Sequence, residues 1–395
     1  MQEQRETLIF SRQQSTSIKG VAIVMLILHH LFLFPSQNHL LTGFFGGSGG
    51  VFEFFLSSVG KLCIPLFFFV SGYGLWQSSR GDCHLWQSTL RRLQNIYTIY
   101  IVTVLVTVLL LFLWTGVLPL KSWRYAVETF LGFNVTINGS WWFFIIYVEL
   151  LLLTPMAVLF VRRFSWGPLL CLSFILYLLS APVSGFPYFA QAVESMGLTS
   201  LLYKTFPVNL FWPNQLYFFT GFCLAVSGIF ETILQRSLNM LYPPFWRYVA
   251  ALVLIAAVLS FRYLFIDIGE FFGVLSKHDI NIFQYITINT RADFILAPVF
   301  IFALVLLSYR HGSPILSFLG NYSAAIWLIH GSIIIIVSNI LKPFHPWSPL
   351  VFFAVLFFCV LYALAYTGIR NLWAAWLPSK VLKVETCKFR PKDGN

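Results

Sequence analysis

The chain has 395 residues, of which 58% are hydrophobic and only 10% are charged, with 25 Lys and Arg against 14 Asp and Glu. Soluble domains carry about 25% charged residues, so this composition, with a mean hydropathy of +0.79, excludes a soluble protein and indicates a protein of the lipid bilayer. The net charge of +11 fits attraction to anionic lipid headgroups, and we expect no nucleic-acid partner.

Apolar segments of spanning length follow one another along the whole chain. A helix needs about 20 apolar residues to cross the hydrocarbon core. The segments predict an all-α, polytopic membrane bundle of about ten transmembrane helices, near residues 18–35, 61–77, 95–118, 141–161, 166–186, 207–230, 245–266, 291–308, 315–340 and 348–377. Residues 1–17 form an N-terminal segment, 18–377 the transmembrane domain, and 378–395 a basic tail.

The basic residues predict the orientation of the bundle, because Lys and Arg in short loops are retained in the cytoplasm. A cytoplasmic N-terminus places 17 of the 25 Lys and Arg on the cytoplasmic side, so we expect both termini there. No small-residue cleavage pattern follows Leu33, and we expect the first span to be uncleaved. The six cysteines show no paired spacing, which predicts neither a disulfide framework nor a metal site.

The first span carries a basic residue and two imidazoles, in "KGVAIVMLILHH" (19–30). Lys19 and His30 are eleven residues apart, so they differ by about 20° around a helix and lie roughly 16 Å apart along one stripe. His29 lies about 80° off that stripe. We expect Lys19 at the mouth of a channel and His30 deeper in it, although hydrogen bonding to a neighbouring helix would also explain either histidine.

The third and fourth spans hold further polar residues. Arg91 and Arg92 open the third span, with Asn95 on the face of Arg92; such guanidinium groups suit phosphate but are also typical of a topology anchor. Glu149 lies about eight residues into the fourth span, with Trp142 on the same face. A carboxylate at that depth needs a partner, and ion-pair packing is the alternative to a catalytic role.

Two further features are an aromatic residue at the start of the fourth span and a group of polar and aromatic residues in the ninth span. Trp141 suits an interfacial aromatic belt. In the ninth span Ser323, Trp327 and His330 form a polar and aromatic stripe, for which interhelical hydrogen bonding is the alternative explanation. The nearby Arg291 and Asp293 are interpreted as a local pair at a span boundary.

In order along the chain, these segments resemble the membrane-bound acyltransferase family 3. Lys19 and His30 match its first-span pattern of a basic residue followed eleven positions later by His, and "PLFFFVSGYGLW" (65–76) matches its second-span ending. "SWWFFIIYVELLLLTP" (140–155) and "LGNYSAAIWLIH" (319–330) match its fourth-span and late patterns. The resemblance runs over nearly the whole chain.

The chain also departs from the family pattern. Arg92 matches the first arginine of an Arg-x-x-Arg motif, but Asn95 stands where the second belongs, and Thr98 replaces a frequent proline. Thr16 stands where many members have Asp, and Trp327 replaces a usual tyrosine. The missing arginine weakens the expectation of strong phosphate binding.

The resemblance implies an O-acyltransferase in a bacterial inner membrane, with cytoplasmic acyl-CoA, most often acetyl-CoA, as donor and a hydroxyl of a cell-surface or lipid-linked saccharide as acceptor. Lys19, Arg91, Arg92 and Asn95 would bind the donor, and His30 would be the general base. Glu149 would orient His30 or bind sugar hydroxyls. Substrate binding would involve Trp142, Ser323, Trp327 and His330, and no metal is expected.

A transporter or flippase for a lipid-linked saccharide is the alternative function. Transporters of that kind usually show internal repeats, and the sequence shows none. A basic cluster at the mouth of a His-bearing span also fits an anionic coenzyme better than a symmetric pathway, so the sequence favours acyl transfer.

Overall fold

The computed structural model describes residues 10–32, 40–185, 208–275, 292–309 and 312–376. Within these ranges every regular element is a helix. In chain order they are α1 (Arg12–Phe32), α3 (Val51–Gly60), α4 (Cys63–Ser79), α5 (Leu85–Thr115), α6 (Trp123–Leu131), the 3₁₀ turn η1 (Gly139–Trp141), α7 (Trp142–Phe164), α8 (Trp166–Gly185), α11 (Val208–Ser227), α12 (Ile229–Met240), α13 (Pro244–Leu275), α15 (Asp293–Leu307), α16 (Pro314–Asn321), α17 (Ser323–Leu341), the 3₁₀ turn η2 (Lys342–Phe344) and α18 (Ser348–Trp376).

The all-α membrane architecture expected from the sequence is confirmed, but the count of about ten spans is not. Seven described helices are long and apolar enough to cross a membrane, or eight if α11 and α12, bent by 70° at Gly228, form one span. The expected fifth and eighth spans coincide with the shorter apolar helices 166–178 and 293–307. The basic tail 378–395 lies outside the described residues, as does most of the segment 1–17.

The expected ninth span, 315–340, is divided into two helices. Tyr322 separates α16 from α17, and the hydropathy of the segment gave no sign of this break because both helices are apolar. The break matters because Ser323, Trp327 and His330 all belong to α17, whereas α16 packs along α1.

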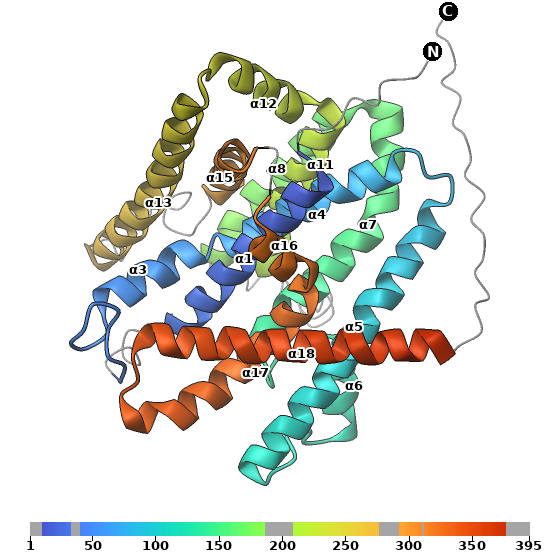
Figure 1. Ribbon diagram of the computed structural model, residues 1–395. Helices are drawn as coiled ribbons and strands as arrows, with labels where there is room; N and C mark the ends of the chain where they lie inside the picture. Colours follow the sequence, from blue (N-terminus) through green and yellow to red (C-terminus); the bar gives the residue numbers. More distant parts are fainter. Residues whose placement is uncertain (1–9, 33–39, 186–207, 276–291, 310–311, 377–395) are drawn as a thin grey trace, which may run out of the picture.

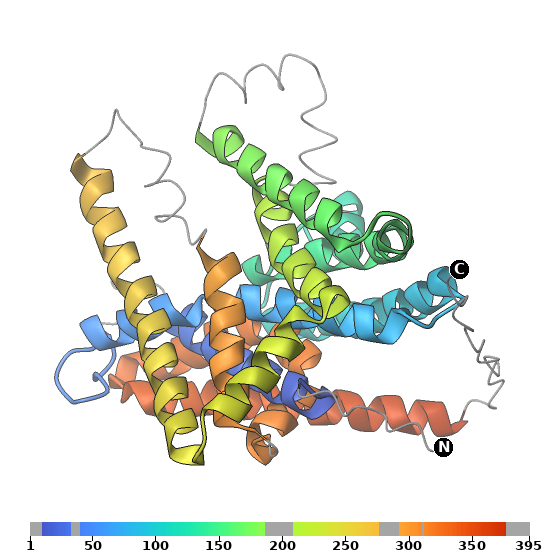
Figure 2. The ribbon, with the colours of Figure 1, turned by 90° about the horizontal axis from the view of Figure 1, so that it is seen from above.

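Helix α1 lies at the centre of the molecule, in contact with α3, α4, α16 and α17 (Figure 1). Seen from above, the pair α8 and α11 and the pair α13 and α15 project from the same side of the layer that contains α1 and α18 (Figure 2). The central position of α1 brings both ends of its Lys19–His30 stripe against other helices.

Glycine allows direct backbone contact at two of these packing sites. A Cβ at Gly20 would overlap the carbonyl of Leu316 in α16, and a Cβ at Gly320 would overlap the carbonyl of Thr16 in α1. Between α4 and α11 the same relation holds at Gly72, where a Cβ would overlap the Phe218 carbonyl. Small residues at helix contacts are typical of packing in lipid, where close approach supplies much of the stabilising energy.

The two ends of the bundle have different connections. At one end, which we call the arginine end, Arg162 at the close of α7 donates to the carbonyls of Ser79, Arg80 and Asp82. At the opposite end Thr42 donates through its hydroxyl to the His345 carbonyl at 2.8 Å, so the first loop is joined to the α17–α18 connection. The first contact agrees with the sequence topology, which places the ends of α4 and α7 on one side.

The glycine contact between α4 and α11 leads to a stability prediction. Gly72→Ala should lower the free energy of unfolding by about 1–3 kcal/mol, as for other overpacked interiors, because its methyl group meets backbone that cannot rotate away. Gly74→Ala is the matched control, since Gly74 lies in the same helix with open space around its Cβ position. Thermal unfolding in detergent would measure both, and equal midpoints would contradict the packing argument.

Candidate active site

Two connected cavities lie at the arginine end. The arginine cavity, of about 370 Å³, is lined by side chains of α5, α7, α16, α17 and α18, among them Arg92, Asn95, Tyr147, Asn321, Tyr366 and Arg370. The lysine cavity, of about 110 Å³, is lined among others by Lys19, Ser71, Phe143, Tyr147, Ser323 and Trp327. Both share the walls formed by Ile96, Tyr147 and Ala324, so they form successive parts of one hollow.

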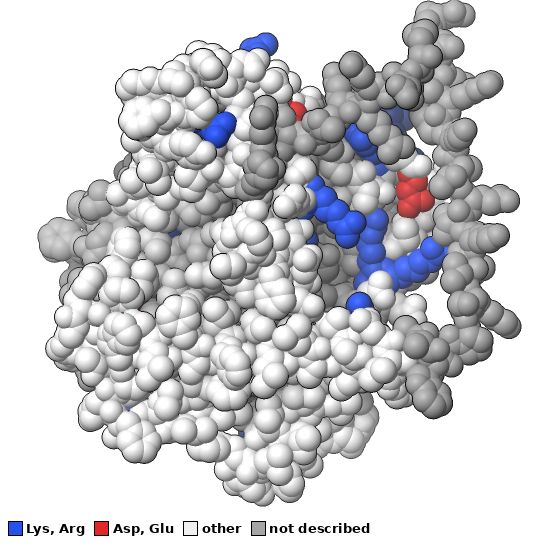
Figure 3. All heavy atoms as spheres, viewed as in Figure 1, with Lys and Arg blue, Asp and Glu red and all other residues white. Residues whose placement is uncertain are grey.

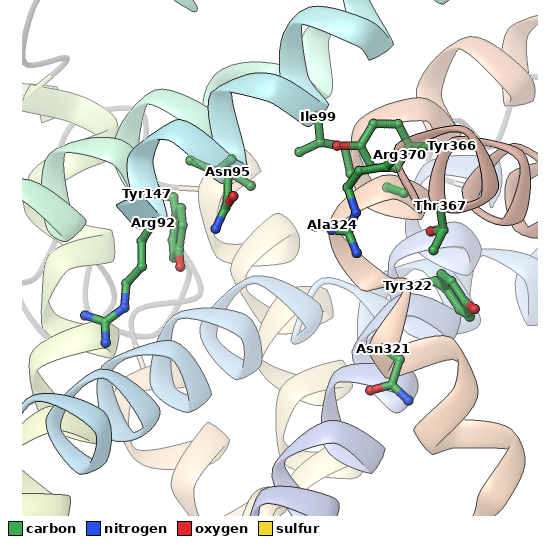
Figure 4. A pocket seen from close by; sticks show the side chains of 12 residues that line it. Arg92, Asn95, Ile99, Tyr147, Asn321, Tyr322, Ala324, Tyr366, Thr367 and Arg370 are labelled. Carbon is green, nitrogen blue, oxygen red and sulfur yellow. The ribbon is translucent and has the colours of Figure 1, made fainter. Parts of the chain in front are cut away.

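The arginine cavity has a guanidinium group on each side. Figure 4 shows Arg92 and Asn95 from α5 on one side, and Arg370 from α18 on the other. On the molecular face of Figure 3, basic side chains gather in one region, whereas the rest of that face carries almost none. Two guanidinium groups that line one cavity from different helices suit an anion with more than one phosphate.

Arg91 and Arg92, treated together in the sequence analysis, have different environments. Arg92 donates through Nη2 to Ser78 Oγ at 3.0 Å and lines the arginine cavity. Arg91 is exposed and lines neither this cavity nor the lysine cavity. The structure therefore brings Arg92 and Asn95, but not Arg91, to the candidate site.

Asp82 supplies a negative charge beside this region. Partial burial raises its pKa, but hydrogen bonds from the Ser88 hydroxyl and the His84 N–H, with the nearby charge of Arg92, outweigh burial and leave the pKa below its ordinary value. Asp82 is thus ionised near neutral pH and offsets part of the positive charge at the arginine end.

A third cavity lies toward the opposite end of α17. This histidine cavity, of about 410 Å³, is lined by His30 and Lys342, by four hydroxyl and amide residues (Asn138, Ser140, Ser338 and Asn339), and by apolar or glycine residues such as Ile334 and Gly331. Lys19 and His30 share a stripe of α1, as the helical period predicts, but they line different cavities. The single channel expected for both residues is therefore divided into two cavities with a barrier between them.

The barrier consists of aromatic rings and a second histidine. Trp327 packs edge-on against Phe143, with ring centroids 4.6 Å apart. One turn further along α17, fully buried His330 places its ring centroid 4.9 Å from that of His30. His30 and His330, which the sequence placed in different spans, are thus brought together.

His29 is held by a different helix. Its Nδ1 lies 2.9 Å from the carbonyl of Ser57 in α3, and the Ser57 hydroxyl donates to the His29 carbonyl at 2.9 Å. His29 lines none of the three cavities. The hydrogen-bonding explanation considered for both histidines therefore describes His29, whereas His30 faces a cavity.

Glu149 and Trp142 occupy another face of α7. Glu149 is two residues, and thus about 200° around the helix, from Tyr147, which lines the arginine and lysine cavities. Neither oxygen of the buried Glu149 carboxylate has a hydrogen-bond partner among the described residues, so no hydrogen bond links it to His30. Trp142 likewise lines none of the three cavities and packs on Phe143.

One sequence interpretation is wrong. Trp141 is fully buried and donates through Nε1 to the Leu328 carbonyl at 2.8 Å, so it belongs to no interfacial belt. Asp293 pairs with buried Arg262 of α13, and the expected pair of Asp293 with Arg291 lies outside the described residues. Arg262 also donates to the Ser58 carbonyl at 3.2 Å, next to the residue that holds His29.

Several lining residues were missed by the sequence analysis. Arg370 was counted only as a topology residue, and Tyr366 carried no signal because aromatic residues are frequent in every span. Ser71 lies inside the quoted second-span motif but received no role. Asn138 was noted nowhere as a site residue, although a polar side chain beside a span start could have pointed to it. Among the described residues, no three His, Cys, Asp or Glu side chains gather as a metal site would require.

The family model described as an acyltransferase domain matches residues 15–368. This chain belongs to acyltransferase family 3. No curated protein and no solved structure matches it. The histidine pair and, apart from Arg370, the lining residues of the three cavities lie within the matched region, so they are features of the acyltransferase domain itself.

The attachment of η1 to α17 in this family 3 acyltransferase can be tested directly. Trp141→Phe should lower the free energy of unfolding by about 0.5–1.5 kcal/mol, the usual contribution of one hydrogen bond, because the Leu328 carbonyl loses the indole donor. Trp142→Phe is the matched control, since the neighbouring Trp142 is only partly buried. A loss of stability in the Trp142 variant alone would contradict the conclusion that Trp141 attaches η1 to α17.

Proposed function

We propose that this membrane acyltransferase moves an acyl group, most simply acetyl, from cytoplasmic acyl-CoA to a hydroxyl of a cell-surface or lipid-linked saccharide, at a bacterial inner membrane. The observation that carries the proposal is the order of the cavities along α17. Cationic cavities at the arginine end are followed by the His30–His330 pair and then by a cavity lined in part by hydroxyl and amide groups.

The donor would enter at the arginine end. Its phosphates would bind Arg92 and Arg370, since charge-assisted hydrogen bonds to phosphate are among the stronger ones in proteins. The family pattern predicts a second arginine at position 95, where this chain has Asn95. Arg370 would supply that second guanidinium group instead. The acyl-bearing arm would pass Lys19 and Ser323 in the lysine cavity and end near Trp327.

The acceptor would enter from the opposite end, into the histidine cavity. Asn138, Ser140, Ser338 and Asn339 offer hydroxyl and amide groups of the kind that bind sugar hydroxyls. Because His30 lines this cavity, an acceptor hydroxyl placed there could approach its imidazole.

Transfer requires the acyl group to pass from the lysine cavity beyond Trp327, so that its carbonyl carbon meets the acceptor hydroxyl beside His30. One nitrogen of His30 takes the proton of the acceptor hydroxyl as its oxygen attacks the acyl carbonyl. The C–O bond forms, the C–S bond breaks, and the leaving thiolate takes the proton back from His30, so that an ester and free coenzyme A result. The buried barrier around Trp327 and His330 limits access of water, which would otherwise compete as acceptor.

The adjacent histidines provide a matched test of this assignment. His30→Asn should lower turnover with labelled acetyl-CoA and a panel of surface glycans by about 10²–10⁴-fold, the usual contribution of general base catalysis. His29→Asn should retain most activity, because its amide can still contact the Ser57 carbonyl. Equal activity of the two variants would remove His30 from catalysis, and saccharide movement without any donor would favour a flippase.

Donor binding can be tested independently of the acceptor. Calorimetry with coenzyme A should show about tenfold or more weaker binding for Arg92→Gln and for Arg370→Gln, since each loses a hydrogen bond to a charged group. Arg91→Gln and Arg163→Gln are controls for these two, because neither arginine lines the arginine cavity. Unchanged affinity in both cavity variants would exclude the arginine cavity as the phosphate site.

A further inference from the structure

The hydrogen bonding of His330 fixes the position of its proton. Nδ1 of His330 lies against the backbone carbonyl of Trp327, one turn earlier in α17. A carbonyl can only accept, so Nδ1 must carry the proton and donate it. In the neutral imidazole, Nε2 then holds a lone pair and can act only as an acceptor.

This acceptor is buried and unused. Nε2 of His330 is buried and has no hydrogen-bond partner among the described residues. A buried acceptor left without a donor costs about 1–3 kcal/mol, so the site favours any donor that comes within reach. The His30 ring makes no bond to this Nε2 in the structure. A ring N–H of His30 can supply the donor after a small rotation, because a centroid spacing of 4.9 Å is compatible with an N–H···N bond of about 3 Å between two imidazole edges.

The surroundings hold His330 in place for this role. A Cβ at Gly331 would overlap Oδ1 of Asn138, so the glycine lets the η1 segment pack directly on α17. Asn138 and Trp141 both donate to the Leu328 carbonyl, at 3.4 and 2.8 Å. The turn of α17 that precedes His330 is thus held to the η1 segment by two donors on one carbonyl.

We infer that His330 is a positioning residue for His30, accepting a hydrogen bond from one ring nitrogen of His30 so that the other stays unprotonated and faces the histidine cavity. This inference rests on the proposed function, in which His30 is the base. His330 keeps its own Nδ1 proton throughout; it selects the tautomer of His30 and stabilises the imidazolium formed when His30 takes the acceptor proton. A base oriented by a third group is a general feature of such sites.

Kinetics test the inference through two substitutions of His330. His330→Leu should lower kcat by about 10²-fold, the order expected when a reacting group is misplaced, with the KM for acyl-CoA unchanged. His330→Gln should recover at least tenfold of that loss, because its side-chain carbonyl can accept the bond. A kcat within twofold of wild type for His330→Leu, or equal losses for Leu and Gln, would overturn the inference.

A spectroscopic measurement separates this inference from the proposed function. In protein labelled with ¹⁵N-histidine at about pH 8, where an ordinary imidazole is neutral, His30 should show one tautomer. His330→Leu should convert it to a mixture, whereas His29→Asn should not; His30→Asn assigns the signals. A mixture of His30 tautomers already present in wild type would overturn the inference. A protein that shows no turnover, but whose His30 has a single tautomer that depends on His330, would refute the proposed function and leave the His30–His330 hydrogen bond standing.

Discussion

Direct backbone contact between α1 and α16 sets the register on which the candidate site depends. Gly20 and Gly320 remove the side chains that would separate the two helices, and the hydroxyls of Ser17 and Ser317 meet at 2.7 Å beside them. Because α17 continues directly from α16, this contact also decides which residues of α17 lie opposite His30. A shift of one helical turn, about 5.4 Å, would separate the imidazoles.

Inside a bilayer, each polar group needs a partner within the protein, and this requirement distinguishes the polar residues of the bundle. His29 and Trp141 meet it by bonding to backbone carbonyls of other elements. Arg262 bonds Asp293 and the Ser58 carbonyl, but its Nη2 has no partner among the described residues. His330 meets it at one nitrogen only, and Glu149 at neither oxygen, among the described residues. The groups whose hydrogen bonding is complete support the fold. His330, whose hydrogen bonding is incomplete and whose neighbour His30 lines a cavity, marks the place where chemistry can occur.

The sequence was sufficient for properties that follow from hydropathy and the helical period. It predicted the membrane class, the family, and the separation of Lys19 and His30 from His29, because each depends on residues close together in the chain. It could not identify the partner helix opposite each stripe. Arg370 reaches the arginine cavity, and Arg262 reaches Asp293, through packing that no local pattern encodes.

The two neighbouring tryptophans show where the same reasoning holds and where it fails. Trp142 and Glu149 are seven residues apart within the regular helix α7, so they share a face as the helical period predicts. Trp141 belongs instead to the 3₁₀ turn before α7, where the α-helical period does not apply, and its indole turns toward α17. The break at Tyr322 has the same origin, since a continuous apolar segment contains no record of where its backbone bends.

The contact of Arg162 with the end of α4 has a consequence for how this protein can vary. Its guanidinium group bonds three main-chain carbonyls, those of Ser79, Arg80 and Asp82, and none of the side chains at those positions. The amino acids there can therefore be exchanged over evolutionary time without loosening the contact. At the exposed position of Arg80, the charge beside the arginine end can thus change while Arg162 still holds α7 against the end of α4.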